Sequence, residues 1–146
     1  MLSKPFRLLI VDDDEEMCQL ITDILASEFE KDTLELTYTN SSQEAEQILA
    51  SEEISIVITD MNMPKLNGYD IAKKCLATKS SHVIVLTGDT SLAVSLTCFR
   101  DGIFALLKKP ISEEKLIHAI RVCVDRLSEW YEIFSAFQVP KKRRAV

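Results

Sequence analysis

Five side chains of the kinds that bind metal ions or phosphate come at the ends of apolar segments. They are Asp12 and Asp13 after "RLLIV", Asp60 after "ISIVIT", Thr87 at the end of "HVIVLT", and Lys109 just beyond "IFALL". Crowded carboxylates repel one another unless a divalent cation neutralises them. Oxygen ligands without His or thiolate favour Mg²⁺ over zinc or copper. A lysine and a hydroxyl group suit the oxygens of a phosphoryl group. The residue types therefore predict a Mg²⁺-dependent phosphoryl site.

Asp60 is the best candidate for the group that reacts. Phosphoryl transfer requires positioning and charge neutralisation, and an Asp carboxylate can itself accept the group as an acyl phosphate. A single Asp at the end of a strand more often only caps a loop. The presence of five such residues at the ends of apolar segments favours a chemical role for Asp60 over a role as a loop cap.

The segments that precede these residues read as strands of one sheet. Strand patterns alternate with helical patterns, which predicts an α/β fold with a doubly wound parallel sheet covered by helices on both faces. The carboxyl ends of parallel strands meet at one edge, where ligands bind in such folds. The second segment alternates in polarity, so we expect an edge strand there. The predicted strands are 7–11, 34–39, 54–59, 82–87 and 103–107.

The helical patterns carry their own start and stop signals. The first, at 14–27, opens with acidic residues and is expected to bury Met17, Leu20, Ile21, Ile24 and Leu25. The second begins with Ser41 or Ser42 as N-cap. The third follows Asn67-Gly68, a pair suited to positive φ. The fourth covers 91–100 and stops at Gly102.

The last helix is predicted to be long. It begins with Ser112 as N-cap, and no Gly or Pro interrupts it before Pro140. Its apolar residues have coiled-coil spacing: Leu116, Ile120, Cys123, Leu127, Trp130, Phe134 and Phe137. We expect Leu116 to Leu127 to pack on the sheet. The rest should form an exposed patch that pairs with a second copy or leads into an output domain: Trp130, Tyr131, Phe134 and Phe137. This divides the chain into a domain at 1–128 and a helix extension with linker at 129–146.

Composition excludes several classes of protein. With 146 residues, 47% of them hydrophobic, the chain fits one globular domain. Its 13 basic and 23 acidic residues up to Gln138 give −10, which argues against direct nucleic acid binding by this domain. The four cysteines are widely spaced, which fits a reducing compartment. No apolar run is long enough to span a membrane or to form a secretory signal, so we expect a cytoplasmic protein.

The motifs that carry these residues resemble a known family. "LLIVDDDEEM", "VITDMNMPKLNGYDI", "VIVLTGD" and "LLKKPIS" occur in the order and spacing of the receiver domain of two-component response regulators. The resemblance covers about residues 7–127. It implies a flavodoxin-like fold with strand order 2-1-3-4-5 and phosphorylation of Asp60. It further implies that Mg²⁺ is bound by Asp13, Asp60 and the backbone carbonyl of Asn62, with Asp12 acting mainly through water.

The resemblance also assigns roles at the other strand ends. Thr87 would be the hydroxyl that moves towards the phosphoryl group, and Lys109 would bind the phosphate, followed by a cis bond to Pro110. The implied partners are a sensor histidine kinase or histidine phosphotransfer protein, and an output domain or protein. Receivers usually carry an aromatic residue three positions before the lysine, but here that residue is Leu106. The usual aromatic response to activation is therefore in doubt.

These residues leave two alternative functions to consider. A phosphohydrolase with an aspartate nucleophile would need a general acid two positions later, and Asn62 cannot donate a proton as an acid. A pseudo-receiver would bind a partner without phosphorylation, but such domains usually lack an acid or the lysine, and this chain retains them all. We therefore expect a signalling switch rather than an enzyme.

Overall fold

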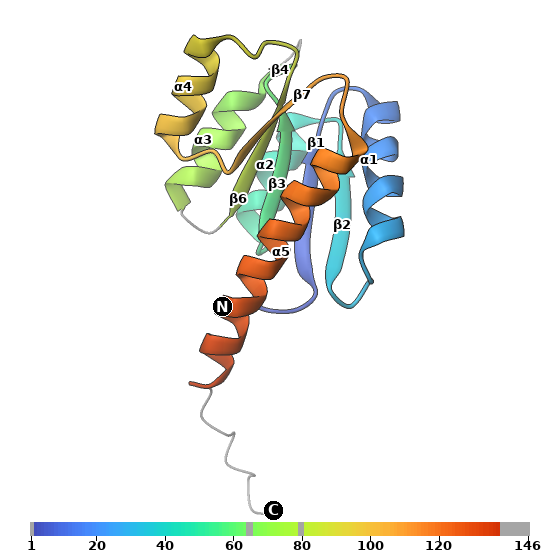
Figure 1. Cartoon of the computed structure of the whole chain (residues 1–146), viewed down its shortest axis with the longest axis vertical. Helices are drawn as coiled ribbons and strands as arrows, with labels where there is room; N and C mark the ends of the chain where they lie inside the picture. The colour runs from blue at the N-terminus through green and yellow to red at the C-terminus, as the bar shows by residue number, and fades with distance from the viewer. Residues whose placement is uncertain (1, 64–65, 79–80, 138–146) are drawn as a thin grey trace, which may run out of the picture.

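The computed structural model describes residues 2–63, 66–78 and 81–137 (Figure 1). The main sheet has five strands, all parallel, in the order β2-β1-β3-β6-β7. Their bounds are β1 Phe6–Val11, β2 Leu34–Thr39, β3 Ile56–Asp60, β6 His82–Thr87 and β7 Ala105–Lys108. In order along the chain these strands lie 2-1-3-4-5, so the predicted doubly wound, flavodoxin-like sheet is confirmed, with β2 at an edge.

Helices cover both faces of this sheet. In Figure 1, α5 crosses one face beside α1, while α2 and α3 lie behind the sheet and α4 lies next to α3. A short two-stranded ladder, β4 with β5, precedes α3. The remaining bounds are α1 Glu15–Glu28, α2 Ser42–Ser51, β4 Asn62–Met63, β5 Leu66–Asn67, α3 Gly68–Thr78, α4 Leu92–Asp101 and α5 Glu113–Ser135.

The core has two layers because side chains alternate along each strand. On β1, Leu8 and Ile10 pack with α1 and α5, whereas Leu9 and Val11 pack with α2 and α3. All four side chains are fully buried. A strand buried on both faces has to be apolar throughout, which is why "LLIV" shows no polar alternation.

The helices begin where side-chain oxygens can bind free backbone amides. Asp14, Ser41, Ser91 and Ser112 are the N-caps of α1, α2, α4 and α5, and each accepts a hydrogen bond from an amide in the first turn. Gly102 ends α4 with a left-handed φ of 85°. These caps hold the helix starts near the carboxyl edge of the sheet.

Several details differ from the sequence predictions. The third and fifth strands each begin two residues later than expected, at Ile56 and Ala105. Leu20 is 51% exposed, whereas Cys18 occupies the buried position on α1. The last helix ends at Ser135 instead of continuing towards Pro140. At about 1.5 Å per residue its 23 residues still extend about 34 Å, and Figure 1 shows α5 projecting beyond the sheet.

Candidate functional site

The site lies at the carboxyl edge of the sheet, as the sequence analysis predicts. β1 and β3 are neighbours, so Asp12, which follows Val11, comes beside Asp60, the last residue of β3. Thr87 ends β6, and Lys109 follows β7. The parallel order of the strands therefore gathers these residues on adjacent strand ends, although up to 97 positions separate them in the chain.

Three carboxylates form the centre of the site. Asp12, Asp13 and Asp60 each place an oxygen within 4.8 Å of the others. Asp12 is fully buried and Asp60 is 6% exposed, whereas Asp13 faces solvent. This set of oxygen donors fits Mg²⁺, which prefers oxygen ligands and keeps several of its waters on an open side.

Asp12 is held in place by the start of α1. The amide of Asp14 donates a hydrogen bond of 3.0 Å to Asp12 Oδ1, and the backbone carbonyl of Asp12 accepts one from the thiol of Cys18. Burial raises the pKa of the Asp12 carboxyl above its ordinary value; the Asp14 amide and Lys109 act against this, and the charge of Asp60 adds to it. Asp12 is thus a carboxylate whose ionised form depends on a nearby positive charge.

Lys109 supplies such a charge. Its Nζ lies 2.7 Å from Asp60 Oδ2 and 3.4 Å from Asp12 Oδ2, and its side chain is 27% exposed. Burial lowers the pKa of Lys109, but the hydrogen bond to Asp60 and the charge of Asp12 outweigh burial, so the pKa lies above its ordinary value. The bond from Lys109 to Pro110 is cis, as the resemblance implies. One cation therefore bridges two of the three carboxylates.

Thr87 is near the site but its hydroxyl is engaged elsewhere. Thr87 Oγ1 donates to the carbonyl of Asp89 at 3.1 Å and accepts from the amide of Asp89 at 3.0 Å. The side chain is fully buried. Its hydroxyl therefore binds its own loop, and it would have to release Asp89 to reach a group on Asp60.

A glycine contributes to the site in a way that sequence reasoning missed. A Cβ atom on Gly68 would overlap the backbone oxygen of Asp60 and would lie 2.9 Å from Thr59 Oγ1. Gly68 does not have a positive φ, so the turn predicted from Asn67-Gly68 is wrong. The residue is needed for close approach, because the first turn of α3 packs directly on the backbone of Asp60. In the sequence, the only hint of this role is that Gly68 belongs to the same motif as Asp60, "VITDMNMPKLNGYDI".

The structure also describes the backbone of Asn62 and the position of Leu106, the other two residues that the resemblance singles out. Asn62 pairs through its backbone with Asn67 in the short β4-β5 ladder, while its side chain lies outside the described residues. Leu106 is half-buried and packs on the core layer below α2 and α3. Phe104, two residues earlier, instead packs edge-on against His82 with ring centroids 5.1 Å apart. The position usually held by an aromatic switch is thus filled by an aliphatic core side chain.

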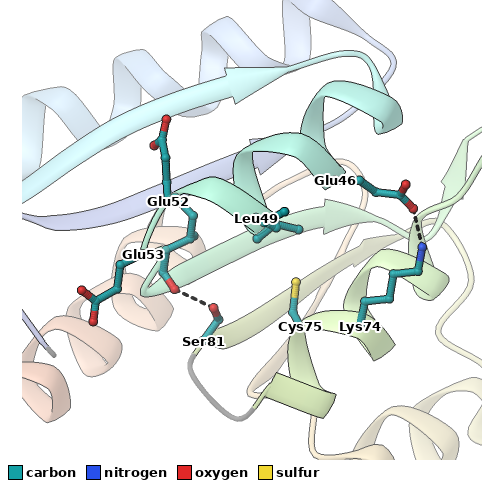
Figure 2. A pocket seen from close by; sticks show the side chains of 9 residues that line it. Glu46, Leu49, Glu52, Glu53, Lys74, Cys75 and Ser81 are labelled. Atoms are coloured by element: carbon teal, nitrogen blue, oxygen red, sulfur yellow. Dashed lines mark hydrogen bonds and ion pairs between the residues drawn. The ribbon is translucent and has the colours of Figure 1, made fainter.

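A cavity of about 310 Å³ lies at the opposite end of the sheet, between α2 and α3 (Figure 2). In this view the thiol of Cys75 points towards Leu49, and Glu46 and Lys74 form an ion pair across the opening. The hydroxyl of Ser81 donates to the carbonyl of Ile54. Ile54 and Ser81 precede the starts of β3 and β6, so this cavity is separate from the carboxylate site.

Comparison with known proteins agrees with this geometry. The sequence model of the response regulator receiver domain matches residues 8–121. The chain belongs to this family. Receiver domains of response regulators are in general signalling proteins rather than enzymes. Within the described residues, no helix is long and apolar enough to cross a membrane.

Individual relatives extend the comparison. The response regulator SaeR of Staphylococcus aureus is 34% identical over 126 residues, which cover 86% of this chain and 53% of SaeR. This receiver chain therefore spans about half the length of that relative. A receiver domain protein from Clostridium thermocellum is 32% identical with a TM-score of 0.72, covering 86% of this chain and 98% of that one. A CheY-like receiver from Methanospirillum hungatei JF-1, at 24% identity and a TM-score of 0.74 over 85% and 97% of the two chains, shares the fold.

Proposed function

We propose that this receiver domain is a phosphorylation-dependent switch in which Asp60 accepts a phosphoryl group from a phosphohistidine. The observation that carries this proposal is the 2.7 Å contact between Lys109 Nζ and Asp60 Oδ2 beside two further carboxylates. A loop-capping Asp needs neither a partly buried cation nor an acidic cluster around it. The donor would be a sensor histidine kinase or a histidine phosphotransfer protein.

The transfer is a substitution at phosphorus. A carboxylate oxygen of Asp60 forms the new P–O bond while the P–N bond to the donor histidine breaks, and the imidazole leaves with the electron pair and takes up a proton. When held by Asp13, Asp60 and the backbone carbonyl of Asn62, with Asp12 acting mainly through water, Mg²⁺ would neutralise charge on the phosphoryl oxygens. Lys109 already lies at the acceptor carboxylate, so it can bind a phosphoryl oxygen without crossing the site.

The switch itself is proposed to depend on Thr87. A phosphoryl group can change the conformation only if it binds one state better than the other. The Thr87 hydroxyl would exchange the backbone of Asp89 for a phosphoryl oxygen, and the loop from β6 to α4 would follow. Because Leu106 is aliphatic, this loop rather than a rotating ring is expected to carry the change.

Several finer assignments belong to the same proposal. The switch would work in the cytoplasm and regulate an output domain or a separate protein partner, and a second copy of the chain is one candidate partner. Residues 1–128 would form the receiver, and 129–146 would lead away from it. The alternative of an aspartate phosphohydrolase is less well supported, because Asn62 stands where a general acid would be required.

The proposal is tested by intact-mass measurement. After incubation with acetyl phosphate and Mg²⁺, the wild-type chain should gain roughly 80 Da, the mass of one phosphoryl unit. The Asp60→Asn variant and an EDTA-treated sample should gain nothing. Asp23→Asn, which changes an exposed acid on α1, serves as the control and should behave as wild type. An Asp60→Asn protein that still gains the mass would show that the acceptor is another residue.

A further inference from the structure

The part of α5 beyond the body of the domain carries a row of exposed apolar side chains. Trp130, Ile133 and Phe134 are 47%, 48% and 44% exposed, and Phe137, in the turn that follows the helix, is 79% exposed. Their spacing of i, i+3, i+4 and i+7 puts them on one side of the helix. We call these four residues, three of which are aromatic, the aromatic stripe. Contiguous exposed apolar groups of this size mark interaction sites.

A neighbouring side of the same helical turns contacts the domain. Tyr131, expected from the sequence in the exposed patch, instead packs edge-on against Phe6 with ring centroids 6.3 Å apart. Lys4 Nζ lies 5.0 Å from the Tyr131 ring and 5.7 Å from the Phe6 ring. This clamp of Lys4, Phe6 and Tyr131 holds the projecting helix in one direction. The stripe is therefore presented by a fixed helix, which reduces the entropy lost on binding.

Within the stripe, two rings already contact each other. Trp130 and Phe134 stack with centroids 5.6 Å apart and an interplanar angle of 24°. A stacked pair offers its outer faces and edges to another aromatic group. The identical pair on a second copy supplies such groups, and a two-fold axis lets each copy bind the other through the same residues.

We propose that the aromatic stripe binds the aromatic stripe of a second copy of this chain, and that this pairing does not require phosphorylation of Asp60. With aromatic side chains of about 150–250 Å² each, the exposed parts of the stripe offer roughly 400–500 Å² per copy. A standard interface takes about 800 Å² from each partner. Flanking residues on the same side of α5, such as Arg126 and the 39% exposed Val122, can add to the contact area.

Charge favours a second copy over other occupants. The 13 basic and 23 acidic residues up to Gln138 give the body a net charge of −10, which repels anionic lipid and nucleic acid. The flanks of the stripe carry both signs, with Arg126 on one turn and Glu129 and Glu132 on the next. Because the stripe projects from the sheet, two helices can meet while the two acidic bodies stay apart.

The position of the stripe explains why phosphorylation is not required. Phe6, which contacts Tyr131, begins β1, and Asp12 follows the other end of that strand. Six residues of strand span about 20 Å. The stripe therefore lies at the opposite edge of the sheet from Asp60 and is exposed before any phosphoryl group arrives.

Sedimentation equilibrium of the full chain tests the proposal directly. In EDTA, without a phosphodonor, the wild-type chain should approach twice the 16.5 kDa of one chain at concentrations of tens of micromolar, and acetyl phosphate with Mg²⁺ should change the dissociation constant less than threefold. Phe134→Glu should weaken association more than tenfold. Asp60→Asn should remain dimeric. Sedimentation therefore tests the dimer independently of whether Asp60 is phosphorylated, which the intact-mass measurement tests.

A matched control removes an equally exposed ring elsewhere. Phe99 on α4 is 81% exposed, and Phe99→Glu should leave the dissociation constant unchanged. If Phe99→Glu abolishes association and Phe134→Glu does not, the interface is on α4 and the proposal is wrong. A wild-type monomer at all concentrations, or one that binds only phosphatidylserine vesicles, would also overturn it.

A second measurement needs no variant. Trp130 is the sole tryptophan of the chain, so fluorescence excited at wavelengths that tyrosine does not absorb reports on the stripe alone. Dilution through the dissociation constant should shift the emission to the red and increase quenching by iodide. Emission and quenching that do not change between a dimeric and a monomeric sample would show that Trp130 lies outside the interface.

Discussion

Lys109 and Asp60 are 49 positions apart in the chain, and their side chains meet at 2.7 Å. The same Nζ atom also lies 3.4 Å from Asp12 Oδ2, so a single positive charge compensates two carboxylates that burial would otherwise disfavour. Three acids and one lysine leave the site with an excess of negative charge. Both the stability of the domain and its affinity for a cation should depend on that imbalance.

Removal of Lys109 should therefore cost stability only when no cation replaces it. The contacts of Lys109 with Asp60 and Asp12 predict that Lys109→Ala lowers the free energy of unfolding in EDTA by about 1–2 kcal/mol, a value discounted because the lysine is partly exposed. Saturating Mg²⁺ should restore most of it, while phosphorylation stays impaired. Urea titrations with and without Mg²⁺ measure this, with Lys108→Ala as control. A Lys109→Ala protein that is unfolded in both conditions would show that Lys109 is needed for folding.

Removal of one carboxylate should have the opposite effect. Asp13 is exposed and its oxygen lies within 4.8 Å of those of Asp12 and Asp60. At that distance in a water-like dielectric, each like-charge repulsion is about 1 kcal/mol. Asp13→Asn should therefore raise the free energy of unfolding in EDTA by about that amount and reduce the further gain on adding Mg²⁺. Thermal unfolding in EDTA and in Mg²⁺ tests this. A variant that is less stable in EDTA would show that repulsion at Asp13 is unimportant.

Gly68 should be sensitive to the smallest possible substitution. The added methyl group of Gly68→Ala would overlap the Asp60 carbonyl oxygen, so the start of α3 or the end of β3 must move. We expect a loss of about 2 kcal/mol or more and a slower phosphorylation of Asp60. Gly88→Ala is the matched control, since no described atom lies within 4 Å of the place that its added methyl group would take. Equal behaviour of the two variants in urea titration and intact-mass kinetics would refute the close-approach argument.

Thr87 separates acceptance of the phosphoryl group from its consequence. Thr87→Ala loses two hydrogen bonds to the Asp89 backbone and should lose about 1–2 kcal/mol of stability. It should still be phosphorylated, because Asp60 and Lys109 are intact. Hydrogen exchange over residues 88–101 should change on phosphorylation in wild type and in Thr87→Ser, which keeps the hydroxyl. The same change in Thr87→Ala would mean that the hydroxyl does not couple the two events.

The buried cysteines should be unreactive in the native state. Burial raises the pKa of the Cys75 thiol to about 11 and that of Cys123 to about 12, from an ordinary value of 9.0. Both thiols therefore stay protonated at pH 8, and alkylation by iodoacetamide should be at least about a hundredfold slower than in urea. The protonated form is the one favoured by folding, so this contribution to stability is complete below pH 9 and is lost as pH rises towards 11–12. Fast native-state labelling at pH 8, located by peptide mass, would contradict it.

The sequence predicts the elements well where local chemistry decides them. Apolar runs mark the five strands, and Ser41 and Ser112 begin their helices as expected. It also predicts that Asp12, Asp60, Thr87 and Lys109 share one edge, because parallel strands must end together. Which oxygen each side chain contacts depends on strand register and rotamers. The contact of Lys109 with Asp12 and the engagement of Thr87 with Asp89 therefore cannot be read from the sequence.

The errors have identifiable physical causes. Leu20 is apolar, so the sequence predicts that it is buried. In the structure Cys18, Ile21 and Leu25 form the buried face of α1, and Leu20 therefore points outwards. The sequence places the end of α5 too late because no Gly or Pro marks it. Just beyond the last turn the amide of Phe137 donates to the carbonyl of Phe134, three residues back, so the α-helical pattern of bonds four residues back ends there.

The contact of Tyr131 with Lys4 and Phe6 holds α5 at the start of β1. From Tyr131 to Ser135 the helix extends about 6 Å further, at about 1.5 Å per residue. A tilt of about 10° at this contact moves the end of the helix by about 1 Å, and in the proposed dimer the two bodies swing by twice the angle. A signal at Asp60 that reached α5 would then be transmitted as a change of angle between two domains that are already joined.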